Sequence, residues 1–124
     1  MRRRGENVSS VELERAIMAH ASVLEVAVHA VPSHLGEDDI KACLVVVDDP
    51  VDLVELFEFF KENLPYFATP RDVQFLAELP KNRVGRVLKH KLREEGVNNS
   101  TVDLESLGLA VAKADRRGRD SRGE

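Results

Sequence analysis

The stretch Ile40-Lys41-Ala42-Cys43-Leu44-Val45-Val46-Val47 is almost continuously apolar and ends in a run of β-branched valines. A strand with one face in water alternates apolar and polar residues, whereas a strand buried on both faces is nearly all apolar. We therefore expect the central strand of a sheet here, with other structure covering both of its faces. Cys43 lies within this run, which favours a buried and unreactive thiol.

Two flanking segments predict further strands. Residues 24–31 alternate in a way that places Leu24, Val26, Val28 and Ala30 on one face, and Pro32 ends the segment. Residues 72–79 alternate more strictly, so we expect a strand with one wet face. Its apolar face would carry Val73, Phe75, Ala77 and Leu79, and its wet face Asp72, Gln74 and Glu78.

Three segments predict helices. Ser9 is a good N-cap with Glu12 three residues later, and we expect that helix to end near His20. Asp52 with Glu55 begins the second helix in the same way, and a basic helix at 87–95 ends at Gly96. One apolar stripe with a helical period marks the second helix: Leu53, Leu56, Phe57, Phe60 and Leu64.

These elements predict an α+β fold: a small three-stranded mixed sheet covered by helices, with a short N-terminal loop or hairpin over residues 1–8. We expect one domain at 1–96 and a weakly structured to disordered tail at 97–124. Within the tail, 102–114 has the pattern of a weak amphipathic helix, and 115–124 is charge, glycine and a single serine without an apolar residue.

Composition limits the kind of protein. The chain has 124 residues, 43% of them hydrophobic and 32% charged, with a net charge of −4, which is ordinary for one soluble domain. The single cysteine cannot form an internal disulfide, the histidines show no metal spacing, and we expect no metal site. No signal peptide and no apolar run long enough to span a bilayer is visible, so we expect a cytoplasmic protein without membrane contact.

The segment Leu79-Pro80-Lys81-Asn82-Arg83-Val84-Gly85-Arg86-Val87-Leu88-Lys89 is the first of two candidate anion-binding motifs. Gly85 allows a tight turn and a close approach to a ligand. Arg83 and Arg86 flank it with guanidinium groups, which suit phosphate or carboxylate oxygens. The alternative is a solvated basic surface that binds nothing.

The second motif is Arg2-Arg3-Arg4-Gly5-Glu6-Asn7-Val8-Ser9-Ser10-Val11-Glu12-Leu13-Glu14. It places a glycine turn and three arginines before a helix N-terminus, a setting that attracts anions. The alternative is an ordinary capped helix entry with a basic lead-in.

The two motifs, in this order, resemble the C-terminal domain of the adenylate-forming (AMP-binding) acyl-CoA synthetases, particularly carnitine/crotonobetaine-CoA ligase-like members. The resemblance covers about residues 2–93. Further similar strings are Asp39-Ile40-Lys41-Ala42 and Tyr66-Phe67-Ala68-Thr69-Pro70. It implies a mobile lid domain that is inactive alone and works with an N-terminal adenylation domain of the same polypeptide, which would lie before Met1.

The resemblance also implies roles for particular residues. Arg86, after Gly85, stands where the family has its adenylation lysine, so this chain departs from the pattern at its catalytic position. Lys89, one helical turn on, is the alternative cation. The Gly5 segment would line the path of the CoA pantetheine, with Arg4, Glu6 and Asn7 beside it.

The implied reaction converts an acid and ATP to an acyl-adenylate and pyrophosphate, then transfers the acyl group to CoA. ATP or AMP, CoA and Mg²⁺ would be cofactors, bound mainly by the adenylation domain, which would also select the acid. Two alternatives stay open: a free-standing anion- or nucleic-acid-binding module, and a degenerate lid kept for regulation. The acidic net charge and the lack of interleaved aromatic residues disfavour nucleic acid.

Overall fold

The computed structural model describes residues 2–3, 6–32, 38–47 and 51–109, and for residues 2–7 it describes the backbone only. These residues form a four-stranded mixed sheet with the strand order β3-β4-β5-β6, beside a separate two-stranded ribbon. In the described ranges no helix is both long enough and apolar enough to cross a membrane.

The central pair of strands confirms the prediction for the apolar run. β4 (Asp38–Val46) is antiparallel to β3 (Val23–Pro32) and parallel to β5 (Asp72–Phe75). Its side chains alternate between two buried clusters, with Ile40, Ala42 and Leu44 in one and Cys43 and Val45 in the other. The strand is therefore covered on both faces.

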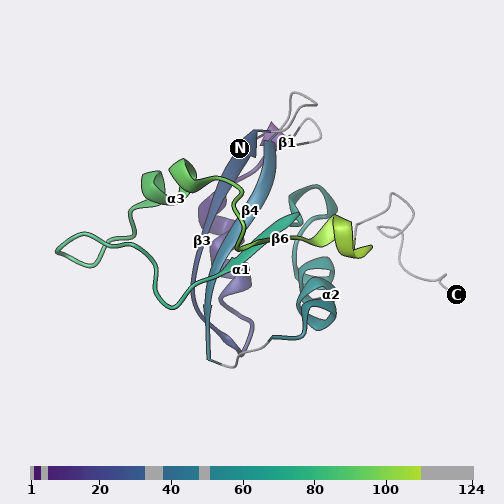
Figure 1. The fold of residues 1–124 in the computed structure, drawn as a ribbon. Helices are drawn as coiled ribbons and strands as arrows, with labels where there is room; N and C mark the ends of the chain where they lie inside the picture. Colours follow the sequence, from purple (N-terminus) through teal and green to yellow (C-terminus); the bar gives the residue numbers. More distant parts are fainter. Residues whose placement is uncertain (1, 4–5, 33–37, 48–50, 110–124) are drawn as a thin grey trace, which may run out of the picture.

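Helices lie on both faces of the sheet (Figure 1). α1 (Ser10–Ile17) and α2 (Leu53–Asn63) contribute to the larger cluster, and α3 (Lys89–Glu95) contributes Leu92 to the smaller one. The predicted caps are present: Ser9 accepts a hydrogen bond from the Glu12 N–H at 3.3 Å, and Asp52 accepts one from the Val54 N–H at 2.9 Å. Most of the predicted stripe of α2 is buried.

The N-terminal hairpin is also present. β1 (Arg2–Arg3) pairs antiparallel with β2 (Glu6–Asn7). Arg4 and Gly5 lie outside the described residues.

The prediction of three strands is wrong by one strand. β6 (Thr101–Asp103) pairs with β5 and is followed by a 3-10 helix (Leu104–Leu107), where we expected the start of an amphipathic helix. Asp103 stabilises the passage from β6 into the 3-10 helix. Its carboxylate accepts a hydrogen bond from Arg71 at 3.0 Å and caps the 3-10 helix by accepting the Glu105 N–H at 3.0 Å. The remainder of the expected helix, 110–114, lies outside the described residues.

The prediction of a wet face on the third strand is also wrong. β5 ends at Phe75 rather than Leu79, and Asp72 and Gln74 are each only 4% exposed. Gln74 is satisfied by the side chain of Lys41, which donates to its Oε1 at 2.7 Å. A polar residue in an alternating strand can therefore be buried when a neighbouring strand supplies its hydrogen-bond partner.

In β3 the alternation predicted for residues 24–31 does not hold at Leu24. Its side chain was expected on the face of Val26 and Val28, but it is 52% exposed. A register shift between Val23 and Glu25 interrupts the pairing with β4 there. Ala27 and His29, on the opposite face of the strand from Val26 and Val28, are buried, at 1% and 3% exposed. Ala27 packs against Leu92 of α3 and Leu79, so this face of β3 is also covered.

Candidate functional site

The first motif folds as a hairpin, defined here as residues 79–88, which projects from the body of the protein between β5 and α3 (Figure 1). Lys81 and Val87 form an antiparallel bridge, and the Asn82 N–H donates to the Arg86 carbonyl at 3.0 Å. At the base, the Leu88 N–H donates to the Pro80 carbonyl at 2.8 Å. We expected a basic helix from Val87, and it begins two residues later because this hairpin closes first.

Asn82 organises the tip of the hairpin. Its side-chain Oδ1 accepts the N–H of Val84 at 3.0 Å and of Arg86 at 2.9 Å, and its carbonyl accepts the Gly85 N–H at 3.1 Å. Gly85 has φ +88°, a conformation that favours glycine. Sequence reasoning singled out Gly85 but missed Asn82, although an Asn in a turn commonly accepts the backbone N–H two residues on, as Asn82 does from Val84.

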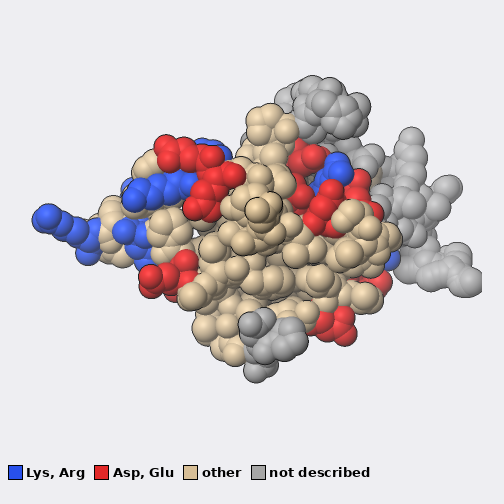
Figure 2. All heavy atoms as spheres, in the orientation of Figure 1, with Lys and Arg blue, Asp and Glu red and all other residues tan. Residues whose placement is uncertain are grey.

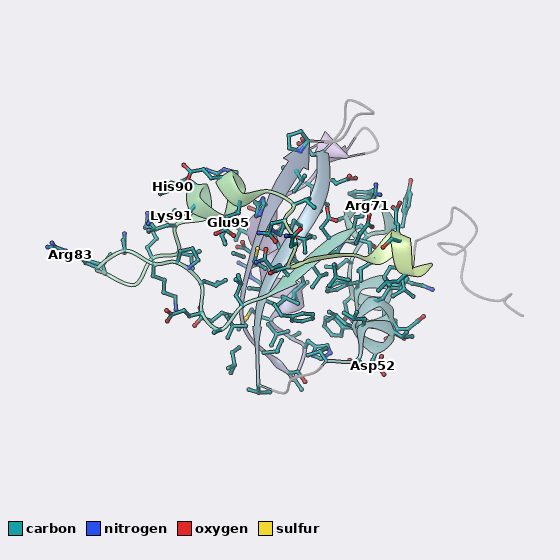
Figure 3. The ribbon with its side chains drawn as sticks, viewed as in Figure 1. Asp52, Arg71, Arg83, His90, Lys91 and Glu95 are labelled. Carbon is teal, nitrogen blue, oxygen red and sulfur yellow. The ribbon has the colours of Figure 1, made fainter. Side chains whose placement is uncertain are left out.

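The side chains at this tip are exposed. Val84 is 86% exposed, and both Arg83 and Arg86 are exposed. Arg83 extends away from the body in Figure 3, and Figure 2 shows a group of Lys and Arg side chains over the hairpin and α3, with acidic side chains beside them. Within the described part of the chain, neither guanidinium pairs with a carboxylate. The arrangement holds two available cations on a fixed backbone, which suits recognition of phosphate or carboxylate oxygens.

The base of the hairpin is attached to the body by apolar and ionic contacts. Leu79 and Leu92, each 3% exposed, are buried against the sheet. Lys81 Nζ pairs with Glu25 of β3 at 2.8 Å. Lys89, the first residue of α3, pairs with Glu14 of α1.

The structure thereby brings the two sequence motifs together. Lys89, at the end of the first motif, also donates to Ser10 Oγ at 3.3 Å, and Ser10 and Glu14 lie in the helix that ends the second motif. Of the predicted CoA-contacting residues, Glu6 and Asn7 form β2, and Arg4 and Gly5 lie outside the described residues. Sequence reasoning identified neither Glu14 nor Glu25 as an anchor, because no spacing rule links them to the hairpin.

A buried lysine holds the far end of α3. Lys41 is 0% exposed, and its ammonium donates to Gln74 and to the carbonyl of Gly96, the C-cap of α3. A cation at a helix C-terminus is favourable because of the helix dipole. Both ends of α3 are therefore fixed by a lysine side chain.

Burial shifts two pKa values on this face of the sheet. It lowers the pKa of His29, although a hydrogen bond to the Ala30 carbonyl opposes the shift, and it raises the pKa of the Cys43 thiol. Cys43 is 0% exposed, which confirms the expected buried thiol. A neutral, inaccessible thiol is a poor nucleophile.

At the opposite side of the molecule, Arg71 binds Asp103 through two hydrogen bonds, of 3.1 and 3.0 Å (Figure 3). This pairing raises the pKa of Arg71 and lowers that of Asp103. The neighbouring Asp72 has its pKa raised to about 6, chiefly by burial and further by Asp103 and Asp39. Among the described residues no group of three or more His, Cys, Asp or Glu is arranged to hold a metal ion.

Comparisons with known proteins agree on one relationship. Residues 12–86 match the model of the AMP-binding enzyme C-terminal domain. The peroxisomal benzoate–CoA ligase of Arabidopsis thaliana is 43% identical over 103 residues, which are 73% of this chain and 18% of that protein. The crotonobetaine/carnitine–CoA ligase of Proteus mirabilis is 37% identical over 94 residues, 75% of this chain and 18% of that protein.

The fold comparison gives the same result. A fatty acyl CoA synthetase of Mycobacterium tuberculosis superposes with a TM-score of 0.70 at 30% identity, covering 77% of this chain and 19% of that one. The chain thus spans less than a fifth of the length of each of these three relatives.

Proposed function

Because the chain belongs to the AMP-binding enzyme C-terminal domain family, we propose that it is the mobile lid of an ATP-dependent acyl-CoA synthetase. The whole enzyme would convert an acid and ATP to an acyl-adenylate, then transfer the acyl group to CoA. Its adenylation domain, in the same polypeptide, would bind most of the nucleotide and Mg²⁺ and would select the acid. The lid alone would be inactive.

One observation carries the proposal: Arg86 has a fixed backbone and a free guanidinium. Asn82 and Gly85 set the backbone, and the side chain is exposed on a hairpin that projects from the domain. Phosphoryl and acyl activation depend on positioning and on neutralising negative charge, so one well-placed cation contributes strongly. In our proposal Arg86 binds the oxygens of the acyl carboxylate and of the nucleotide.

The geometry favours Arg86 over Lys89 for this role. The Lys89 ammonium is held by Glu14 and Ser10 against α1, so using it as the reacting cation would first require breaking an ion pair. Arg86 has no competing partner among the described residues. Arg83, also exposed, would be a second contact for phosphate oxygens.

We propose that the second half-reaction uses the β1–β2 hairpin, with Gly5 and the neighbouring Arg4, Glu6 and Asn7 beside the CoA pantetheine. The antiparallel ribbon precedes α1 and leads directly into its capped N-terminus. We further propose the cytosol as the location, although some plant relatives carry peroxisomal names.

The proposal is tested by two assays on two proteins. The full-length protein that contains this domain is incubated with ATP, Mg²⁺ and a panel of aliphatic and aromatic carboxylic acids. Acid-dependent exchange of pyrophosphate into ATP and thioester formation with CoA are then measured. We expect both activities with at least one acid, and neither with purified 1–124. Turnover by 1–124, or salt-dependent binding of random oligonucleotides by it, would contradict the lid function.

A further inference from the structure

Glu14 stands at a junction of three elements. It lies in α1, and its Oε2 accepts the backbone N–H of Val28 in β3 at 2.8 Å. The same oxygen is paired with the ammonium of Lys89, the first residue of α3. The Glu14 side chain is 20% exposed and that of Lys89 28%, so neither group is fully solvated.

The Val28 contact gives the carboxylate at this site a structural role. β3 is an end strand of the described four-stranded sheet, so the N–H groups on its outer side have no strand partner. An unpaired backbone donor in a partly buried position costs free energy. Glu14 satisfies the Val28 N–H and is held by it, and this fixed carboxylate then holds Lys89.

The hairpin depends on contacts at its base. Its residues from Lys81 to Arg86 are all exposed, and it is attached to the sheet by Leu79 and Val87, by Lys81 and by side chains at the start of α3. Lys81 pairs with Glu25, but the side chains of that pair are 35% and 37% exposed, and exposed ion pairs contribute little. The less exposed Glu14–Lys89 pair has additional hydrogen bonds at both of its ends and is the stronger attachment.

We propose that Glu14 is a positioning residue. Through its ion pair with Lys89 it fixes the orientation of the hairpin, and therefore of Arg86, relative to the sheet. Lys89 is three residues after Arg86 and is separated from it only by the closing strand of the hairpin. Through this pair the helix that ends the second motif fixes the orientation of the first motif, so the adenylation cation Arg86 and the second-motif helix move as one rigid unit. This inference rests on the proposed lid function for its catalytic consequence, but not for its structural one.

The structural part is tested on the 1–124 chain without reference to catalysis. Amide ¹⁵N relaxation is measured for wild type, Glu14→Gln and the matched control Glu25→Gln. In Glu14→Gln the glutamine side-chain oxygen can still accept the Val28 N–H. The backbone amide of Val28 should therefore stay protected from hydrogen exchange. We expect faster local motion at Gly85 and Arg86 in Glu14→Gln and a smaller change in Glu25→Gln. Unchanged relaxation at both amides in Glu14→Gln would overturn the proposal.

The catalytic part is tested on the full-length protein by a double-mutant cycle. Glu14→Gln should lower kcat for pyrophosphate exchange about tenfold with KM for ATP little changed, because misplaced catalytic groups cost rate rather than binding. Lys89→Met should do the same, and the double variant should be no worse than Lys89→Met alone, since both substitutions act on the same Glu14–Lys89 ion pair. Additive losses, or equal losses in the adenylation and thioester steps, would overturn the positioning role. Failure of the wild type to adenylate any acid would instead contradict the lid function, and the relaxation result would still decide the inference.

Discussion

Arg86 is the residue that we propose to occupy the position of the family's adenylation lysine. Arginine keeps the positive charge of lysine but is broader, planar and less able to act as a compact point charge. In the full-length protein, Arg86→Lys should raise the rate of pyrophosphate exchange severalfold, because the slimmer ammonium fits the site that the family builds for lysine. Unchanged or lower exchange would mean that the surrounding pocket is adapted to arginine, or that the lid has a regulatory role. Arg83→Lys, at the same hairpin tip, is the matched control.

Asp72 gives a pH-dependent prediction. The pKa of Asp72 is about 6 in the folded protein against 3.8 in the reference state, so the folded state binds the proton more tightly. The stability contributed by the protonated carboxyl is present below pH ~4 and is lost as the pH rises through about 6. Asp72→Asn should therefore raise the free energy of unfolding at pH 7.5 by about 1–3 kcal/mol and change it little at pH 4.

Urea unfolding of wild type and Asp72→Asn at the two pH values checks this prediction. Asp103→Asn is the control of opposite sign, because Arg71 lowers the pKa of Asp103. It should destabilise the protein at pH 7.5 and have less effect at low pH. Equal effects of Asp72→Asn at both pH values would show that its pKa is unshifted.

At the scale of elements, local rules predicted the helices well. Ser9 and Asp52 cap the helices that they were expected to cap, and the apolar stripe of α2 is largely buried, because caps and periodicity act within a few residues. The errors in the strands arose from distant partners. Gln74 was assigned to a wet face because no local pattern shows that Lys41, 33 residues earlier, satisfies it.

The candidate site was predictable to a similar degree. The basic segment and its glycine turn could be read from the sequence. The projection of the hairpin and its attachment through Glu14 could not, because Glu14 and Lys89 are far apart in sequence and meet only when α1 and α3 pack beside β3.

The β1–β2 hairpin leads to a prediction on the second half-reaction. If the Gly5 turn lines the path of the CoA thiol, Gly5→Leu should leave pyrophosphate exchange intact and reduce thioester formation at least tenfold, because a side chain would obstruct that path. Both steps are measured on the full-length protein, with Gly5→Ala as a smaller obstruction. Equal loss of the two steps would contradict this role for the hairpin.

For the whole molecule, residues after Gly96 also contribute to the sheet and the core. β6 pairs with β5, Leu104 is 0% exposed, and its N–H donates to the Arg71 carbonyl at 2.8 Å. A chain that ends at Gly96 should lose about 2–5 kcal/mol from the missing Leu104 side chain alone. That is a large share of the stability of a small domain.

Urea unfolding of 1–96 and 1–109 measures this loss, and 1–109 is the matched control because it retains every described residue. Equal stability of the two chains would show that β6 and the 3-10 helix contribute nothing to the core. It would also support 1–96 as the complete domain.

Cys43 gives the molecule an internal probe. It is the single cysteine of the chain, and its side chain is 0% exposed. It lies in the cluster with Leu79 and Leu92, the two leucines that anchor the hairpin and α3 to the sheet. A thiol-specific reagent can reach the sulfur only when this layer separates from the strands beneath it. The labelling rate of the unmodified protein therefore measures how often the layer that carries Arg86 opens, without an added fluorophore or spin label.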